Sequence, residues 1–98
     1  MYIAYYSDNI KKFIHSLEKG DIKKIYNALE ILETLGSNID MPLSKPIGDG
    51  LFELRVKNIR ILYTFRENSA VLLSIFKKKL YRIPRREIDL AKYRLNSL

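Results

Sequence analysis

Two consecutive stretches near the start of the chain carry apolar residues at helical spacing. The first stretch follows Ser7 or Asp8, either of which can cap a helix, and Gly20 ends it. Asp21 can cap the second stretch, which ends at Gly36. The pattern therefore predicts an αα-hairpin with one apolar stripe on each helix. The stripes are Ile10, Phe13, Ile14 and Leu17 in the first helix, and Ile22, Ile25, Tyr26, Leu29, Leu32 and Leu35 in the second.

Alternation of apolar and polar residues predicts strands on both sides of this hairpin. Residues 2–6 form a short first strand, and residues 51–56, 59–66 and 70–76 form three more. The connections Lys57-Asn58 and Glu67-Asn68-Ser69 have the length of hairpin turns, so these three strands are antiparallel. The prolines and glycines between residues 37 and 50 predict a loop.

The last predicted element is a helix with Pro84 in its first turn. Glu87 and Asp89 are favourable near the positive end of its dipole. The predicted order is βααβββα in a single domain spanning residues 1–98, which indicates the α+β class. We expect an antiparallel sheet whose apolar face packs against the N-terminal helical hairpin. The polar residues of the strands, from Glu53 to Arg66, should point away from that face.

Composition excludes several kinds of site. The chain has no cysteine and a single histidine, His15, so transition-metal ligands are scarce and no metal or other cofactor is expected. His15 lies beside the apolar stripe of the first helix, where a solvated surface histidine is the simplest reading. No apolar run reaches the length of a membrane span and no secretory signal is evident. We expect a cytoplasmic domain without membrane contact.

The charge is unevenly distributed along the chain. Residues 1–49 carry a net charge of −1 and residues 50–98 carry +8, which together give the net +7 of the chain. Six of the ten residues from Lys77 to Arg86 are basic. This asymmetry indicates a polyanionic partner, either a nucleic acid or an acidic protein, although a solvated basic surface gives the same pattern.

The hairpin around Lys57-Asn58 has an unusual feature. Counting outward from the turn places Arg55 directly opposite Arg60, and like charges opposite each other destabilise a sheet. An anion bound between two guanidinium groups would make the pair tolerable. Alternatively, both side chains extend into water, or Glu53 neutralises one of them. If the pair binds a phosphate, replacing one arginine should leave stability unchanged or raise it slightly.

Several short motifs, in this order and spacing, resemble the RelE/ParE toxin superfamily, and in particular its HigB-like, phage-derived branch. The resemblance extends over residues 1–94 and is densest from Pro42 onward. The motifs are Lys45-Pro46, Gly50-Leu51-Phe52-Glu53-Leu54-Arg55, Arg60-Ile61-Leu62-Tyr63, Phe76 with Lys78-Lys79, and Pro84 with Glu87-Ile88, Ala91 and Arg94.

The resemblance implies a RelE-like fold and the toxin of a type II toxin–antitoxin pair. Most relatives are ribosome-dependent endoribonucleases that cut mRNA, so mRNA and the ribosome are the expected partners. A small helix-turn-helix antitoxin is the other expected partner, and the two proteins can form a toxin–antitoxin hetero-oligomer. ParE-like relatives instead inhibit DNA gyrase, and some members are inert. The inert alternative is favoured at Leu51 and Glu53, where ribonuclease members often have lysines, and at Ser74, where the branch often has a histidine.

The resemblance also implies roles for individual residues. Arg60 matches the arginine that ribonuclease members place at the scissile phosphate, and Arg55 matches that of the ELR motif. The implied catalytic set is Arg55, Arg60, Lys78, Lys79 and Tyr81. The implied RNA-binding set is Lys57, Arg66, Lys77, Arg82, Arg85 and Arg86.

Metal-free RNA cleavage needs groups that transfer protons as well as groups that stabilise charge. Arginine remains protonated in proteins, so Arg55 and Arg60 can only orient the phosphate and stabilise its charge. Proton transfer falls to Lys78, Lys79, Tyr81 or Glu53, and the sequence leaves the choice open. Tyr81 can also stack on a base or pack against the last helix.

Overall fold

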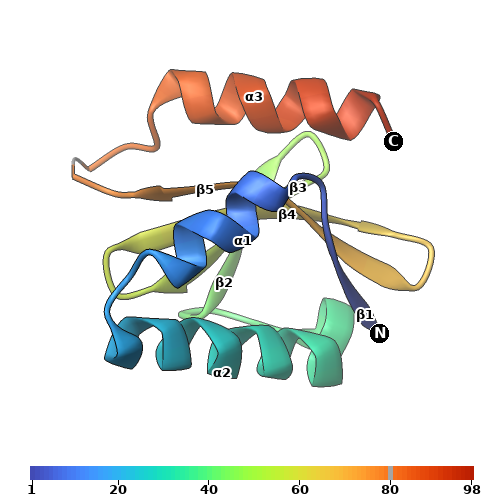
Figure 1. The fold of residues 1–98 in the computed structure, drawn as a ribbon. Coiled ribbons are helices and arrows are strands. Elements are labelled where there is room, and N and C mark those ends of the chain that lie inside the picture. Colours follow the sequence, from blue (N-terminus) through green and yellow to red (C-terminus); the bar gives the residue numbers. More distant parts are fainter. Residues whose placement is uncertain (80) are drawn as a thin grey trace.

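The computed structural model describes residues 1–79 and 81–98 as three layers (Figure 1). Helices α1 (Asp8–His15) and α2 (Lys19–Leu35) cover one face of a five-stranded sheet, and α3 (Arg85–Asn96) lies across the other. A short 3-10 helix, η1 (Gly36–Asn38), follows α2. The strands are β1 (Tyr2–Tyr5), β2 (Ser44–Gly48), β3 (Leu51–Val56), β4 (Ile59–Arg66) and β5 (Ser69–Lys77). The predicted α+β class is confirmed. No helix in the described ranges is long and apolar enough to cross a membrane.

The strands follow the order β1-β5-β4-β3-β2 across the sheet. Strands β2 to β5 form an antiparallel meander, and the short connections between β3, β4 and β5 had predicted this for those three strands. Strand β1 pairs parallel with β5, with Tyr2 opposite Ser69 and Tyr5 opposite Leu72. The sheet is therefore mostly antiparallel rather than wholly so. Parallel neighbours need a long crossover connection, and the helices and the meander together supply it.

The β3–β4 hairpin has the predicted strand bounds and register. Among its core-facing residues, Leu54 and Ile61 are fully buried in the cluster shared with α1 and α2. The helices contribute several buried residues to the same cluster, and Ile14, Ile25 and Leu32 among them have no exposed surface. The apolar face of the sheet thus receives the two N-terminal helices, as the matching stripes predicted.

Strand β2 was expected to be part of a loop, and this prediction is wrong. Proline has no amide hydrogen and is restricted to sheet edges and bulges, so Pro46 and Gly48 argue against a strand in the sequence. In the structure β2 is an edge strand, and its register with β3 shifts between these two residues. An edge strand and a bulge are the positions where a sheet tolerates a proline and a glycine.

Three helix boundaries also differ from the prediction. Helix α1 ends at His15, where the Ser16 hydroxyl donates a hydrogen bond of 2.6 Å to the Phe13 carbonyl. Gly20 lies in the first turn of α2 instead of ending α1. Pro84 is the residue that precedes α3, one position earlier than expected. These shifts change no packing face.

The face of the sheet opposite α1 and α2 is only partly polar. A second apolar cluster lies there beneath α3, and its centre is Leu62, Leu73 and Ala91, each with no exposed surface. Glu53, Thr64 and Ser74 lie in the same layer and are also buried. The expectation that the polar strand residues face open solvent is therefore wrong for this part of the sheet.

Candidate functional site

The opposed arginines of the hairpin are present in the structure, since Arg55 pairs with Arg60 across β3 and β4. The turn between them places Lys57 in the left-handed region, with a φ of 57°. A buried carboxylate sits beside both arginines. The Nε of Arg55 donates to Oε1 of Glu53 at 2.9 Å, and the Nε of Arg60 lies 3.8 Å from Oε2.

Glu53 explains how the sheet tolerates its arginine pair. Its side chain is only 2% exposed, so its charge acts on both guanidinium groups with little screening by water. Of the explanations open from the sequence, neutralisation by Glu53 is the one observed, and it extends to both arginines. The two arginines and Glu53 (the Arg55–Glu53–Arg60 triad) together carry a net charge of +1.

Arg60 donates hydrogen bonds only through Nη1, and its Nε and Nη2 have no hydrogen-bond partner among the described residues. Its Nη1 donates to the carbonyl oxygens of Lys57 at 2.6 Å and Ile59 at 3.0 Å, which fixes the plane of the guanidinium. Its Nε is buried beside Glu53. Within residues 1–79 and 81–98, Nη2 makes no hydrogen bond. Arg60 is therefore held rigidly and can offer Nη2 to a ligand.

A cationic cleft opens at the turn end of this hairpin. Its volume is about 630 Å³, and it is bounded by the β3–β4 turn and the segment that follows β5. The backbone N–H of Lys78 donates to the Asn58 carbonyl at 2.7 Å, which ties that segment to the turn. Among the residues that the structure describes, its lining contains four basic side chains and no acidic one. The lining residues are Lys57, Asn58, Arg60, Lys78, Lys79 and Tyr81.

The four cations of the cleft differ in how far carboxylates compensate them. Arg60 lies beside Glu53, and the Nζ of Lys57 binds Oδ1 of Asp21 on α2 at 2.8 Å. This hydrogen bond raises the pKa of Lys57 and lowers the pKa of Asp21. Lys78 and Lys79 form no ion pair within the described ranges. They are the cations most available to an anion. Tyr81 is 99% exposed at the same rim.

The structure thus gathers five of the expected site residues around one cleft, namely Arg60, Lys57, Lys78, Lys79 and Tyr81. Arg55 does not line the cleft, and it lies opposite Arg60 in the sheet with Glu53 beside both. Arg66 lies at the other end of β4, where its Nη2 donates to the Leu98 carbonyl at 3.1 Å. Lys77 ends β5 and is exposed.

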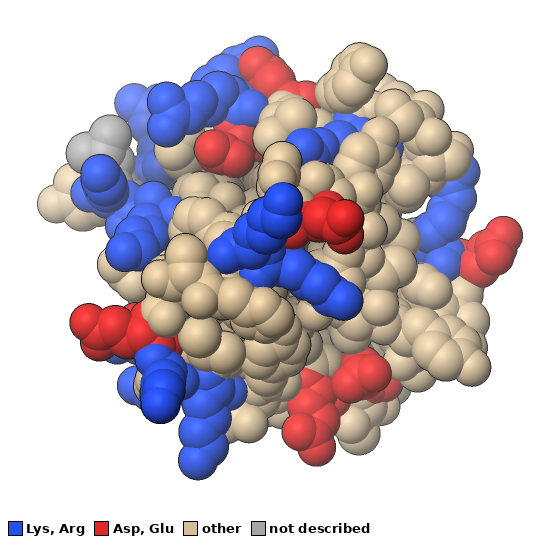
Figure 2. Space-filling view, viewed as in Figure 1, with Lys and Arg blue, Asp and Glu red and all other residues tan. Residues whose placement is uncertain are grey.

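Three arginines of the expected RNA-binding set follow the cleft residues in the sequence. Arg82 and Arg85 line a separate hollow of about 390 Å³ together with Ile83 and Ile88. Arg86 forms an ion pair with the adjacent Glu87, with 3.7 Å between Nε and Oε2. Lysines and arginines gather at the upper left of Figure 2, over the segment that joins β5 to α3 in Figure 1.

Two contributors to the site were missed in the sequence. Asn58 lines the cleft and accepts a bond from Lys78, but an asparagine in a turn is common enough to carry no functional signal. Asp21 was assigned only as a helix cap, and its contact with Lys57 joins elements far apart in the chain. No periodic pattern reveals such a contact.

Ser74 occupies the position where the related branch often has a histidine, and it does not line the cationic cleft. Its side chain is buried, and its Oγ has no hydrogen-bond partner in the part of the chain that is described. It borders a hollow of about 260 Å³ between α1 and α3, near Glu87 and Arg94. Ser74 is thus placed away from any phosphate held by Lys78 and Lys79.

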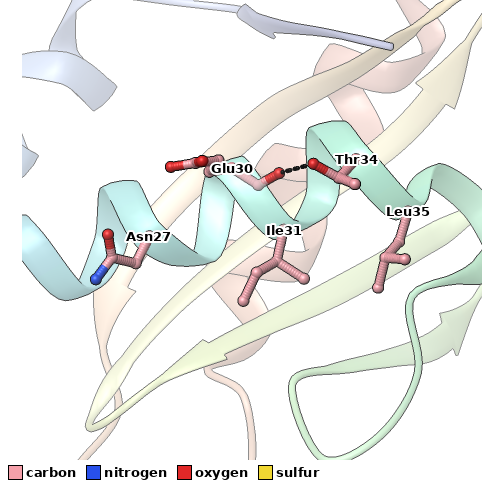
Figure 3. A pocket seen from close by; sticks show the side chains of 5 residues that line it. All are labelled: Asn27, Glu30, Ile31, Thr34 and Leu35. Carbon is pink, nitrogen blue, oxygen red and sulfur yellow. Dashed lines mark hydrogen bonds between the residues drawn. The ribbon is translucent and has the colours of Figure 1, made fainter.

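A further groove of about 460 Å³ runs along the outer side of α2, and the described residues that line it include no basic one. Asn27, Ile31 and Leu35 point to the same side of the helix, away from Glu30 and Thr34 (Figure 3). Ile31 and Leu35 are 43% and 45% exposed. This groove is apolar, so it is chemically unlike the cleft between the hairpin turn and the segment after β5.

Fold and cleft together define a small α+β protein with a basic site at the open end of a β-meander. The chain belongs to the family described as phage derived protein Gp49-like (DUF891), whose sequence pattern matches residues 12–96. Its fold is similar to a chain in the solved YoeB-YefM complex from Staphylococcus aureus, with a TM-score of 0.62 and 20% sequence identity. The match covers 83% of this chain and 98% of that one. No curated protein matches the sequence.

Proposed function

We propose that the protein is the toxin of a type II toxin–antitoxin system, a HigB-like member of the RelE/ParE superfamily that cleaves mRNA on the ribosome. The observation that carries the proposal is the cationic cleft. It combines a rigid arginine, two lysines without ion pairs among the described residues and an exposed tyrosine. The Gp49-like family and the fold shared with a chain of a toxin–antitoxin complex support the same assignment.

The cleft supplies the electrostatic part of the reaction. In metal-free cleavage the 2′-oxygen attacks the adjacent phosphorus and the bond to the 5′-oxygen breaks, leaving a 2′,3′-cyclic phosphate and a 5′-hydroxyl. Negative charge accumulates on the non-bridging oxygens of the phosphorane. Arg60, Lys78 and Lys79 all line the cleft in which we place those oxygens. Preorganised donors of this kind commonly contribute about 2.7–4 kcal/mol each to the transition state.

The structure narrows the groups that can transfer protons. The 2′-hydroxyl must lose one proton and the 5′-oxygen must gain one. Glu53 is unsuited to either step, because it is buried beside two guanidinium groups and does not line the cleft. Lys78, Lys79 and Tyr81 remain as the candidates, since all three side chains border the cleft. We assign proton transfer to this group of three and charge stabilisation to Arg60.

The test compares Lys78→Gln, Lys79→Gln and Arg60→Lys with the wild-type protein. Each protein is expressed under a tight promoter, growth is followed, and cleavage of a reporter mRNA on translating ribosomes is mapped by primer extension. We expect each variant to lower the cleavage rate about 100-fold or more, as for other lost oxyanion donors. Lys92→Gln is the charge-matched control, because Lys92 pairs with Asp49 at the opposite end of β3. Full toxicity of the Lys78 and Lys79 variants would contradict the assignment.

A second candidate is a relative that binds RNA without cutting it. One observation favours it: Glu53 already occupies the guanidinium edges that a bidentate phosphate contact would need. The same ribosome assay separates the two functions. A non-cutting protein would protect RNA in a manner that depends on Lys78 and Lys79, yet would generate no new 5′ ends.

A further inference from the structure

The hollow beside the cationic cleft differs from it in chemistry. It holds about 390 Å³, within the range of small-molecule sites, and combines two arginines with two isoleucines. Ile83 and Ile88 pack against the buried cluster under α3, so the apolar part of the lining is anchored in the fold. A phosphate group would gain nothing from this apolar surface. A flat aromatic ring beside the arginines would use both parts of the lining.

The arginines of this hollow are available for stacking. Arg82 is exposed, and the Arg85 side chain is 86% exposed. The Nε of Arg85 lies 3.3 Å from Oδ1 of Asp89 one turn along α3, which restrains one edge of the guanidinium. An edge contact leaves the flat faces of the guanidinium unoccupied by Asp89. Guanidinium planes stack well on unpaired bases, through dispersion and cation–π attraction.

The hollow and the cleft are lined by consecutive residues of the chain. Tyr81 lines the cleft, and the next residue, Arg82, lines the hollow. Consecutive Cα atoms are about 3.8 Å apart. A single strand with one phosphate in the cleft therefore has its neighbouring nucleotide within reach of the hollow.

We propose that this hollow, formed by Arg82, Ile83, Arg85 and Ile88, holds the unstacked base of a nucleotide next to the phosphate bound in the cleft. The inference rests on the proposed function, because it assumes that the cleft binds the backbone of single-stranded RNA. It assigns Arg82 and Arg85 to a base instead of to phosphates. It also makes the hollow the place where the protein contacts a base of its substrate.

The test measures binding of a fluorescein-labelled RNA hexanucleotide by anisotropy, at low salt and without ribosomes. Six further hexanucleotides each carry one abasic residue, so the backbone charge stays constant while one base is removed. We expect one abasic position to weaken binding about tenfold in the wild-type protein, the usual scale for one stacked base. In Arg85→Lys, which keeps the charge but removes the planar group, and in Ile83→Ala, this position should lose most of its effect. Thermal unfolding of both variants confirms that they fold.

The possible failures separate the inference from the proposed function. If all abasic hexanucleotides bind the wild-type protein equally, while Lys78→Gln and Lys79→Gln weaken every one of them, the cleft binds RNA and the hollow does not hold a base. If a base effect persists undiminished in both Arg85→Lys and Ile83→Ala, the base lies elsewhere and the inference is wrong. If the wild-type protein binds no hexanucleotide, both the inference and RNA binding by the isolated cleft fail.

Discussion

Replacing Glu53 by Gln tests the central electrostatic argument, because it removes one charge and almost no volume. Gln keeps an oxygen that can accept from Nε of Arg55, but it leaves two guanidinium groups facing each other across β3 and β4. At an effective dielectric constant of about 20, two charges 3.8 Å apart, as for Arg60 and Glu53, interact by about 4 kcal/mol. Desolvation of the buried groups offsets part of this attraction. We expect Glu53→Gln to lower the free energy of unfolding by about 3 kcal/mol.

The same triad reverses the effect expected for Arg60 from the sequence alone. Cross-strand repulsion by itself predicts that Arg60→Gln is neutral or slightly stabilising. In the structure Arg60 also donates to the carbonyls of Lys57 and Ile59 and compensates a buried carboxylate. We therefore expect Arg60→Gln to cost about 2 kcal/mol. When Glu53→Gln is already present, Arg60→Gln should lower the free energy of unfolding by clearly less than it does alone, because it then also removes the repulsion between Arg60 and Arg55.

The assay is thermal and urea unfolding of the two single variants and the double variant at neutral pH. For a domain of this size, 3 kcal/mol corresponds to a fall in Tm of about 12–24 °C. Glu67→Gln makes the same chemical change at an exposed turn residue and should stay within about 0.5 kcal/mol of the wild type. If Glu53→Gln unfolded at the wild-type temperature, or if Arg60→Gln raised it, the triad would contribute nothing and the reasoning would be refuted.

Two further predictions concern pH and the partner. Burial is the main cause that raises the pKa of Tyr5 to about 12, so the contribution of its neutral form to stability is complete below pH 10, the ordinary pKa of tyrosine, and is lost as pH rises towards 12. Between pH 9 and 11 the free energy of unfolding of Tyr5→Phe should therefore fall less than that of the wild type. Equal falls would contradict this prediction. A neutralising antitoxin should place an acidic segment over the cleft. Amide hydrogen exchange at Lys78 and Lys79 should therefore be slower in the complex than in the free protein. Unchanged exchange there would mean that the antitoxin acts without covering the cleft.

Apolar residues at every second position made the bounds and register of the β3–β4 hairpin predictable to the residue. Its apolar positions repeat every second residue, and the turn length sets the pairing of Arg55 with Arg60. The second apolar cluster was not predicted, although Leu62 interrupts the alternation between Ile61 and Tyr63. A strand that is apolar on both faces is covered on both faces, and this run of three apolar residues is the signal that was available.

The candidate site was predictable in composition and not in arrangement. The basic tract from Lys77 to Arg86 stands out in the sequence, but alternation ends with β5, so no pattern shows which of its residues turn towards Arg60. Their separation into a cationic cleft and an adjacent arginine–isoleucine hollow depends on where the chain travels after the sheet. Neutralisation by Glu53 was one of three explanations for the arginine pair that the sequence left open, and only the three-dimensional structure distinguishes them.

The parallel pairing of β1 with β5 has a consequence for the order of assembly. Every other strand pair joins neighbours in sequence, so the meander can form early from local contacts. The pairing of Tyr2 with Ser69 closes the longest loop of any strand pair in the sheet, and the entropic cost of closure rises with loop length. During synthesis the N-terminal strand therefore remains without its partner until β5 has emerged. The residues of the cleft that follow β5 emerge later still, so the nascent chain completes its fold and its basic site almost together.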